Sequence, residues 1–172
     1  MASAWATRLP KSFDAAAAYL NWATDFVKPE AFKPAAAVVL KLEPTSLNTD
    51  ISRRLFTVAA HFKDVPLAQQ TWAWTKKMFE KYGYDNNAAT GMGDVLTALN
   101  LKVEAKECWD RALTGNPDSS DFWQCATRLL ALLPEPEKPK FLDTLLAKDS
   151  GFHFSFATAR ADYMVKANDI DG

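Results

Sequence analysis

The sequence of 172 residues has few of the side chains from which disulfide frameworks, metal centres and catalytic sites are built. It contains two cysteines, Cys108 and Cys125, and two histidines, His61 and His153. Two cysteines exclude a disulfide framework and favour a reducing compartment, where free cysteines pack as small apolar residues. Neither histidine lies near a cysteine or a spaced set of carboxylates, so no metal-ligand spacing is present. We therefore predict a protein that is not an enzyme, with no cofactor and no metal.

Long hydrophobic runs are also missing. The longest have six residues, 15–20 and 35–40, whereas a membrane-spanning helix needs about 20. We therefore predict no membrane span. Near the N-terminus, Arg8 and Lys11 precede the first acidic residue, as in organellar targeting segments, but this stretch is short and interrupted by proline.

The net charge is close to zero but unevenly distributed. It is −1 in total, from 20 basic and 21 acidic residues, and it divides into +4 for residues 1–83 and −5 for residues 84–172. Proteins that bind nucleic acids usually carry a basic face, because neutralising phosphates supplies much of their affinity. Any such face is confined to the first half here, and the composition does not favour a nucleic acid as partner.

Strand signals are scarce, whereas helix start and stop signals recur about every fifteen to twenty residues. Capping residues, prolines and apolar residues spaced three and four apart predict an all-α protein of paired helices. The predicted starts are Ser12, Pro29 with Pro34, Asn48 or Thr49, Asp64 with Pro66, Asp85, the region of 104, Asp118 or Ser119, and the region of 138. The second helix is expected to run toward Pro44, and Gly83 to end the fourth in a left-handed conformation. A further short helix is expected at about 157–165.

One stretch has a more specific spacing of small and large residues. Ala105, Trp109, Ala112 and Pro117 are separated by four, three and five positions. Small residues let two helices approach closely, while a large one fills the gap to the next pair. The same frame assigns packing roles to Gly93, Leu96 and Trp123, and to Ala68 and Trp72, which lie 37 residues before Ala105 and Trp109 respectively.

This series resembles the tetratricopeptide repeat, a helix-turn-helix unit of about 34 residues, and the related pentatricopeptide repeat. The resemblance implies a right-handed superhelical array of about four antiparallel helix pairs over residues 12–148. Residues 1–11 would form an N-terminal extension and 149–172 a C-terminal tail. A plain helical bundle is the alternative, because a pattern of four positions also occurs by chance in alanine-rich helices.

Trp72 and Trp74 pose a separate question, because residues two apart on a helix do not face the same neighbour. One interpretation makes Trp74 a contact for a partner protein. The other has Trp72 packing within its own helix pair and Trp74 against the adjoining pair.

The resemblance also implies a function. Arrays of helix pairs bind peptides, folded subunits or single-stranded RNA. The segments LAQQTWAW and EAKECWDRAL, together with the length and the helix count, resemble the accessory subunit that euglenozoan mitochondrial F1-ATPases carry on their alpha subunits. That resemblance implies a non-catalytic structural subunit in the mitochondrial matrix, with the ATP synthase alpha subunit as its partner. The alternatives are a pentatricopeptide-type RNA-binding protein and a general tetratricopeptide adaptor, which could be cytoplasmic.

Overall fold

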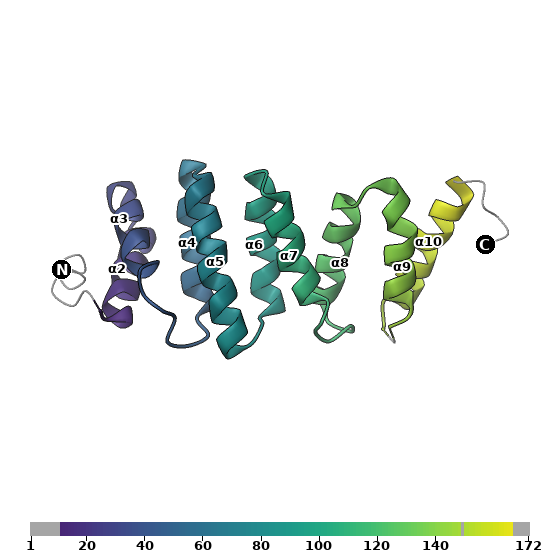
Figure 1. Ribbon diagram of the computed structural model, residues 1–172, viewed down its shortest axis with the longest axis horizontal. Coiled ribbons are helices and arrows are strands. Elements are labelled where there is room, and N and C mark those ends of the chain that lie inside the picture. The colour runs from purple at the N-terminus through teal and green to yellow at the C-terminus, as the bar shows by residue number, and fades with distance from the viewer. Residues whose placement is uncertain (1–10, 149, 167–172) are drawn as a thin grey trace. The chain divides into compact units, whose positions relative to one another are not determined.

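The computed structural model describes residues 11–148 and 150–166, and these residues form helices joined by turns and loops (Figure 1). They contain nine α-helices, a single 3-10 turn and no strand, which confirms the all-α prediction. The elements are α2 (Phe13–Asp25), α3 (Pro29–Val39), α4 (Thr49–Phe62), α5 (Val65–Tyr82), α6 (Asn86–Ala98), α7 (Lys102–Ala112), α8 (Ser120–Leu132), η1 (Glu135–Glu137), α9 (Lys138–Leu146) and α10 (His153–Lys166).

The chain divides into two compact units, residues 1–105 and 106–172. The boundary falls inside α7, whose first four residues belong to the first unit. Each unit has its own packed interior, and the two are described separately below.

Side-chain caps start the helices where the sequence predicts them. In five helices the capping oxygen accepts a hydrogen bond from the backbone N–H three residues later, at donor–acceptor distances of 3.0–3.3 Å. The five caps are Ser12, Asn48, Asp64, Asp85 and Ser119. Each cap is worth about 1 kcal/mol because it satisfies a backbone donor that the helix itself leaves unpaired.

Three helices of the first unit also end in the same way. Val27, Lys63 and Asn100 follow α2, α4 and α6 with φ of 48°, 50° and 61°, and they are the only described residues other than glycine with positive φ. In each turn the next residue donates its N–H to a carbonyl five residues back: Lys28 to Ala23 at 2.9 Å, Asp64 to Ala59 at 2.9 Å and Leu101 to Leu96 at 2.8 Å. This is the Schellman arrangement, which satisfies carbonyls at a helix C-terminus.

Some predicted boundaries differ from the structure. The helix α3 ends at Val39, well before Pro44, and a turn follows it. Gly83 has the expected positive φ of 103°, but its ψ of 161° is extended instead of left-handed helical. The C-terminal helix begins at His153, earlier than residue 157, because Phe156 is buried and extends its packed face.

In the first unit, α2 packs against α3 and α4 against α5, while α4 also contacts α2, α3 and α6. Fully buried alanines stand at these contacts, beside large buried side chains. The alanines include Ala16, Ala23, Ala35, Ala36, Ala59, Ala68 and Ala89, and the large residues include Leu20, Leu55, Phe56, Met78 and Leu96. Alanine permits close approach of the helix axes, so the larger side chains can fill the remaining space at the density of a protein interior.

The second unit has a smaller core in which α9 packs against α10 and η1. Its buried side chains include Trp109, Phe122, Cys125, Leu129, Leu142 and Leu145. Trp123 stacks on Phe152 with ring centroids 5.3 Å apart and lies 5.2 Å from Phe156, which attaches α10 to α8. The loop before α10 is fixed by the Ser150 hydroxyl, which donates to the Pro117 carbonyl at 2.9 Å.

Candidate docking surfaces

The residues predicted to pack the repeats lie mostly in the interior. Gly93, Leu96, Ala105, Trp109, Ala112, Ala68 and Trp72 are buried, whereas Pro117 and Trp123 are half-buried. Positions that are buried in this way serve packing, so a surface that binds a partner must be sought among other residues.

Trp74 is buried within its own chain, which corrects the interpretation that it, or Trp72, is exposed for a partner. Only 5% of Trp74 and 3% of Trp72 is exposed. The Trp74 ring lies parallel to Phe13 at 6.1 Å, and its Nε1–H donates to the Leu42 carbonyl at 2.7 Å. The reason is that the segment after α3 folds back over α5 and covers the second tryptophan. Trp74 thus packs against the adjoining helix pair and the segment after it, which is the part of the alternative interpretation that concerns Trp74.

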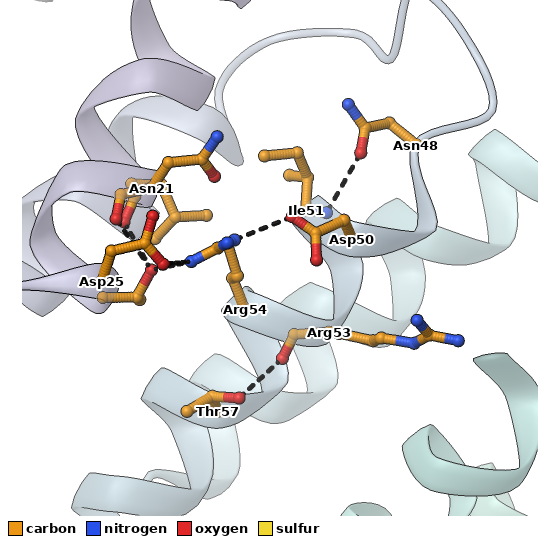
Figure 2. Close-up of polar contacts among 10 residues, drawn as sticks. Asn21, Asp25, Asn48, Asp50, Ile51, Arg53, Arg54 and Thr57 are labelled. Carbon is orange, nitrogen blue, oxygen red and sulfur yellow. Dashed lines mark hydrogen bonds and ion pairs between the residues drawn. The ribbon is translucent and has the colours of Figure 1, made fainter.

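A polar cluster joins α2 to α4 around the guanidinium group of Arg54 (Figure 2). Arg54 Nη1 donates to Asp25 Oδ1 at 2.5 Å and to Thr24 Oγ1 at 2.6 Å, and Nε donates to Asp50 Oδ2 at 2.8 Å. Asp25 lies at the C-terminal end of α2 and Asp50 in the first turn of α4. The guanidinium thus connects the C-terminal end of α2 to the first turn of α4.

Electrostatics in this cluster favour a charged Arg54. Partial burial alone would lower the pKa of the guanidinium, but the hydrogen bonds to Asp50 and Asp25 outweigh it, so the pKa of Arg54 is raised. Its neighbour Arg53 donates to Asn87 Oδ1 on α6 at 2.6 Å. Arg54 is neutralised by two carboxylates and is not poised to hold a phosphate group, whereas Arg53 bonds only a neutral amide and keeps its charge.

Two adjoining hollows form a groove between α3 and α5. One has a volume of about 280 Å³ and the other about 230 Å³, and both are lined by Leu40 and Gln70. Its rim carries Lys33, whose Nζ lies 2.6 Å from Asp64 Oδ2. The Lys33 hydrogen bond and the Leu67 backbone N–H lower the pKa of Asp64. Charges of both signs and a polar floor leave this groove without a marked chemical preference.

A third hollow in the first unit lies between the α4–α5 turn and the α6–α7 turn. Its volume is about 400 Å³, and we call it the turn pocket; it is lined by Ala60, Lys63, Val65, Ala98, Leu99 and Asn100. The second unit has a hollow of about 390 Å³ near η1, with Lys106, Glu137 and Lys140 among its lining residues. No described residues gather as three or more metal-binding side chains.

Exposed apolar side chains concentrate at the turns that join paired helices of the first unit. Eight large apolar residues are exposed among the described residues, and five of them belong to these turns or flank them: Phe26, Val27, Phe62, Val65 and Val103. Phe26, Val27 and Val103 are 66%, 68% and 79% exposed. The other three are Leu47, Phe154 and Val165. Phe62 lies seven and three positions after the buried Leu55 and Ala59, yet it is 37% exposed because α4 ends there.

Comparisons with protein families, with curated proteins and with solved structures found no match. Within residues 11–148 and 150–166, no helix is long and apolar enough to span a membrane.

Proposed function

We propose that this chain is a non-catalytic helical-repeat protein whose function is to dock onto another protein, as an accessory structural subunit of a larger complex. The identity of that complex is inferred from the resemblance described above. The complex would be a mitochondrial one such as the F1 part of ATP synthase, and the alpha subunit would be the surface that it covers.

The observation that carries the repeat interpretation is the recurrence of the same local geometry along the first unit. The capping residues Ser12, Asn48 and Asp85 are 36 and 37 positions apart. The left-handed residues Val27, Lys63 and Asn100 have the same two spacings. Each left-handed residue follows its cap by 15 positions, so three successive first helices have a common design. A plain bundle has no need of such a period, whereas a stacked array does.

Protein docking is favoured over catalysis by the character of the described surface. The turn pocket is lined mainly by apolar side chains, the groove between α3 and α5 mixes apolar with charged ones, and the described residues hold no cluster of three or more metal-binding groups. Partner proteins are bound through exposed apolar side chains with a polar rim, and five such apolar residues lie at the turns of the first unit.

Single-stranded RNA is the second candidate, because pentatricopeptide arrays bind it. The pairing of Arg54 with Asp25 and Asp50 counts against it, since this arginine would otherwise be available for phosphates. The net charge of −5 in residues 84–172 also opposes a strand that would follow the chain.

The test is affinity purification of the tagged full chain under gentle conditions, with and without nuclease. We expect a stoichiometric companion that survives nuclease treatment. A companion lost upon nuclease treatment would instead support the RNA alternative. Recovery of the chain alone, at its own mass, would contradict both interpretations.

A further inference from the structure

The turn pocket differs from the other hollows in the charge of its lining. Lys63 is the only charged residue among its six lining residues, and the other five contribute apolar surface or the amide of Asn100. Lys63 is exposed and forms no ion pair within the described part of the chain. The pocket therefore presents an uncompensated positive charge beside an apolar floor.

Neighbouring charges do not cancel this character. Lys102 begins α7 next to the pocket, is exposed, and likewise has no carboxylate partner among the described residues. Of the acidic residues adjacent in sequence, Asp64 is paired with Lys33 Nζ at 2.6 Å, whereas Glu104 accepts a hydrogen bond from the neutral Gln69 amide at 3.0 Å and keeps its charge, so Lys63 and Lys102 together leave a net positive charge. The C-terminal ends of α4 and α6 and the N-terminal ends of α5 and α7 meet here, so their dipoles largely oppose one another.

The surroundings of the pocket extend its apolar surface. Figure 1 shows the α4–α5 and α6–α7 turns side by side at the same end of their helices. Val65 lines the pocket and is exposed, and Val103, also exposed, lies in the first turn of α7; the Phe62 ring instead packs against Phe32 of α3. Val103 lies three residues after the lining residue Asn100, so it adds one exposed apolar side chain beside the α6–α7 turn.

We propose that the turn pocket is a docking site for an acidic segment of a partner protein, in which one large apolar side chain is flanked by carboxylates. The apolar side chain would enter the pocket between Val65 and Leu99, and the carboxylates would meet Lys63 and Lys102. This inference rests on the proposed function and adds to it the place of contact and the chemistry of the partner. The volume of about 400 Å³ accommodates one aromatic side chain with room at the rim.

The groove between α3 and α5 is a weaker candidate for this partner. Of its three lysines, Lys33 and Lys77 are paired with Asp64 and Glu43, the second pair at 3.7 Å, and Lys41 has no carboxylate partner among the described residues. An acidic segment would have to displace carboxylates that are already present, at a cost that the turn pocket does not impose.

The probe is a short fluorescein-labelled peptide with a central tryptophan and glutamates on both sides, titrated with the full-length chain. Three matched peptides replace the glutamates by glutamine, the glutamates by lysine, or the tryptophan by alanine. Fluorescence anisotropy should give the tightest binding for the acidic tryptophan peptide, with a loss of about tenfold or more for each of the other three. Backbone amide shifts in a ¹H–¹⁵N spectrum should move at residues 60–65 and 98–103.

Two variants test the pocket itself. Ala98→Trp fills it from an exposed helical position, and Lys63→Glu reverses its charge while keeping a residue with a side chain at the left-handed position. Both should weaken the acidic peptide by about tenfold or more while the far-UV circular dichroism stays unchanged. Lys41→Glu makes the same charge change on the rim of the other groove and should leave binding unaltered.

Several results would overturn this inference. They are equal binding by the wild type and both pocket variants, equal or tighter binding of the lysine peptide, and amide shifts confined to the α3–α5 groove. A dimer in solution that Ala98→Trp dissociates would make a second copy the occupant, and competition by oligouridine would point to RNA. If the wild-type chain co-purifies with a stoichiometric companion and the Ala98→Trp variant binds that companion equally well, the turn pocket is not the docking site, while the proposed function stands.

Discussion

Among single residues, Val27 has the most strained backbone conformation of the three left-handed turn residues. A β-branched side chain at φ 48° crowds the neighbouring carbonyl, whereas glycine and asparagine tolerate that region. We expect Val27→Gly to raise the free energy of unfolding by about 1 kcal/mol, measured by urea denaturation. Asn100→Gly at the equivalent turn is the control, and its gain should be smaller. Equal gains at both positions would show that β-branching adds no strain.

Gly91 offers a second stabilising change. It lies inside α6, and a Cβ added there would meet no atom within 4 Å. Gly91→Ala should therefore stabilise the chain by about 0.5–1 kcal/mol, because alanine loses less backbone entropy in a helix. The comparison is Gly83→Ala, which also has open space but a φ of 103° and should lower the melting temperature. A loss of stability from Gly91→Ala would mean that something covers this position.

The Lys33–Asp64 pair predicts a pH dependence. The pKa of Asp64 is lowered from 3.8 in the folded state, so the unfolded chain binds its proton first as the pH falls. The stabilisation is thus complete well above pH 3.8 and is lost as the pH drops below that value. Asp64→Asn keeps the helix cap but removes the charge, and it should cost up to about 1 kcal/mol at pH 7. Once the pH falls below the lowered pKa of Asp64, the stability of the variant should approach that of the wild type, as measured by urea denaturation across pH; a difference independent of pH would contradict the assignment.

At the scale of elements, Trp74 connects α5 to the segment after α3. We expect Trp74→Ala to lower the free energy of unfolding by about 3–5 kcal/mol, because a buried aromatic ring is lost and the Leu42 carbonyl loses its donor. Trp74→Phe should cost less, since it keeps most of the ring packing. Thermal denaturation of the two variants separates the contribution of ring packing from that of the hydrogen bond to Leu42. An unchanged melting temperature in Trp74→Ala would return Trp74 to the surface and to a direct role in docking.

Helix starts could be predicted from the sequence because a cap depends on a few adjacent residues. Ser12, Asp64 and Asp85 bond the backbone three positions ahead, whatever the rest of the fold does. The end of α3 at Val39 could not be predicted in this way, because no local signal stops that helix there and tertiary packing decides it. Burial of Trp74 also depends on tertiary packing, which is why the sequence left its placement open between two interpretations.

At the scale of the whole molecule, side-chain bonds between different helices stay local in sequence. Among the described residues, the hydrogen bonds from a side chain to another helix or its adjoining loop join positions 17 to 38 apart, from Arg160–Asp143 to Tyr82–Pro44. Separations of this size are expected when each repeat contacts only the repeats next to it in the sequence.

We therefore expect a fragment of residues 11–117, which contains α2 to α7, to remain helical and to unfold cooperatively on heating, as followed by circular dichroism. A fragment of residues 11–98 lacks α7, exposes Leu96 and should melt at a lower temperature. If the longer fragment is unstructured, stability depends on contacts that a local array does not have.

The sequence by itself determined the helical class, most helix starts and the small-and-large packing residues, because capping and periodicity act within a few positions of the chain. The tertiary structure decided which apolar side chains are covered. Phe62 and Val103 carry no sequence signal for exposure, and Trp74 carries none for burial; each outcome depends on where a neighbouring helix or loop ends. The turn pocket likewise exists only because two turns, distant in sequence, lie beside each other.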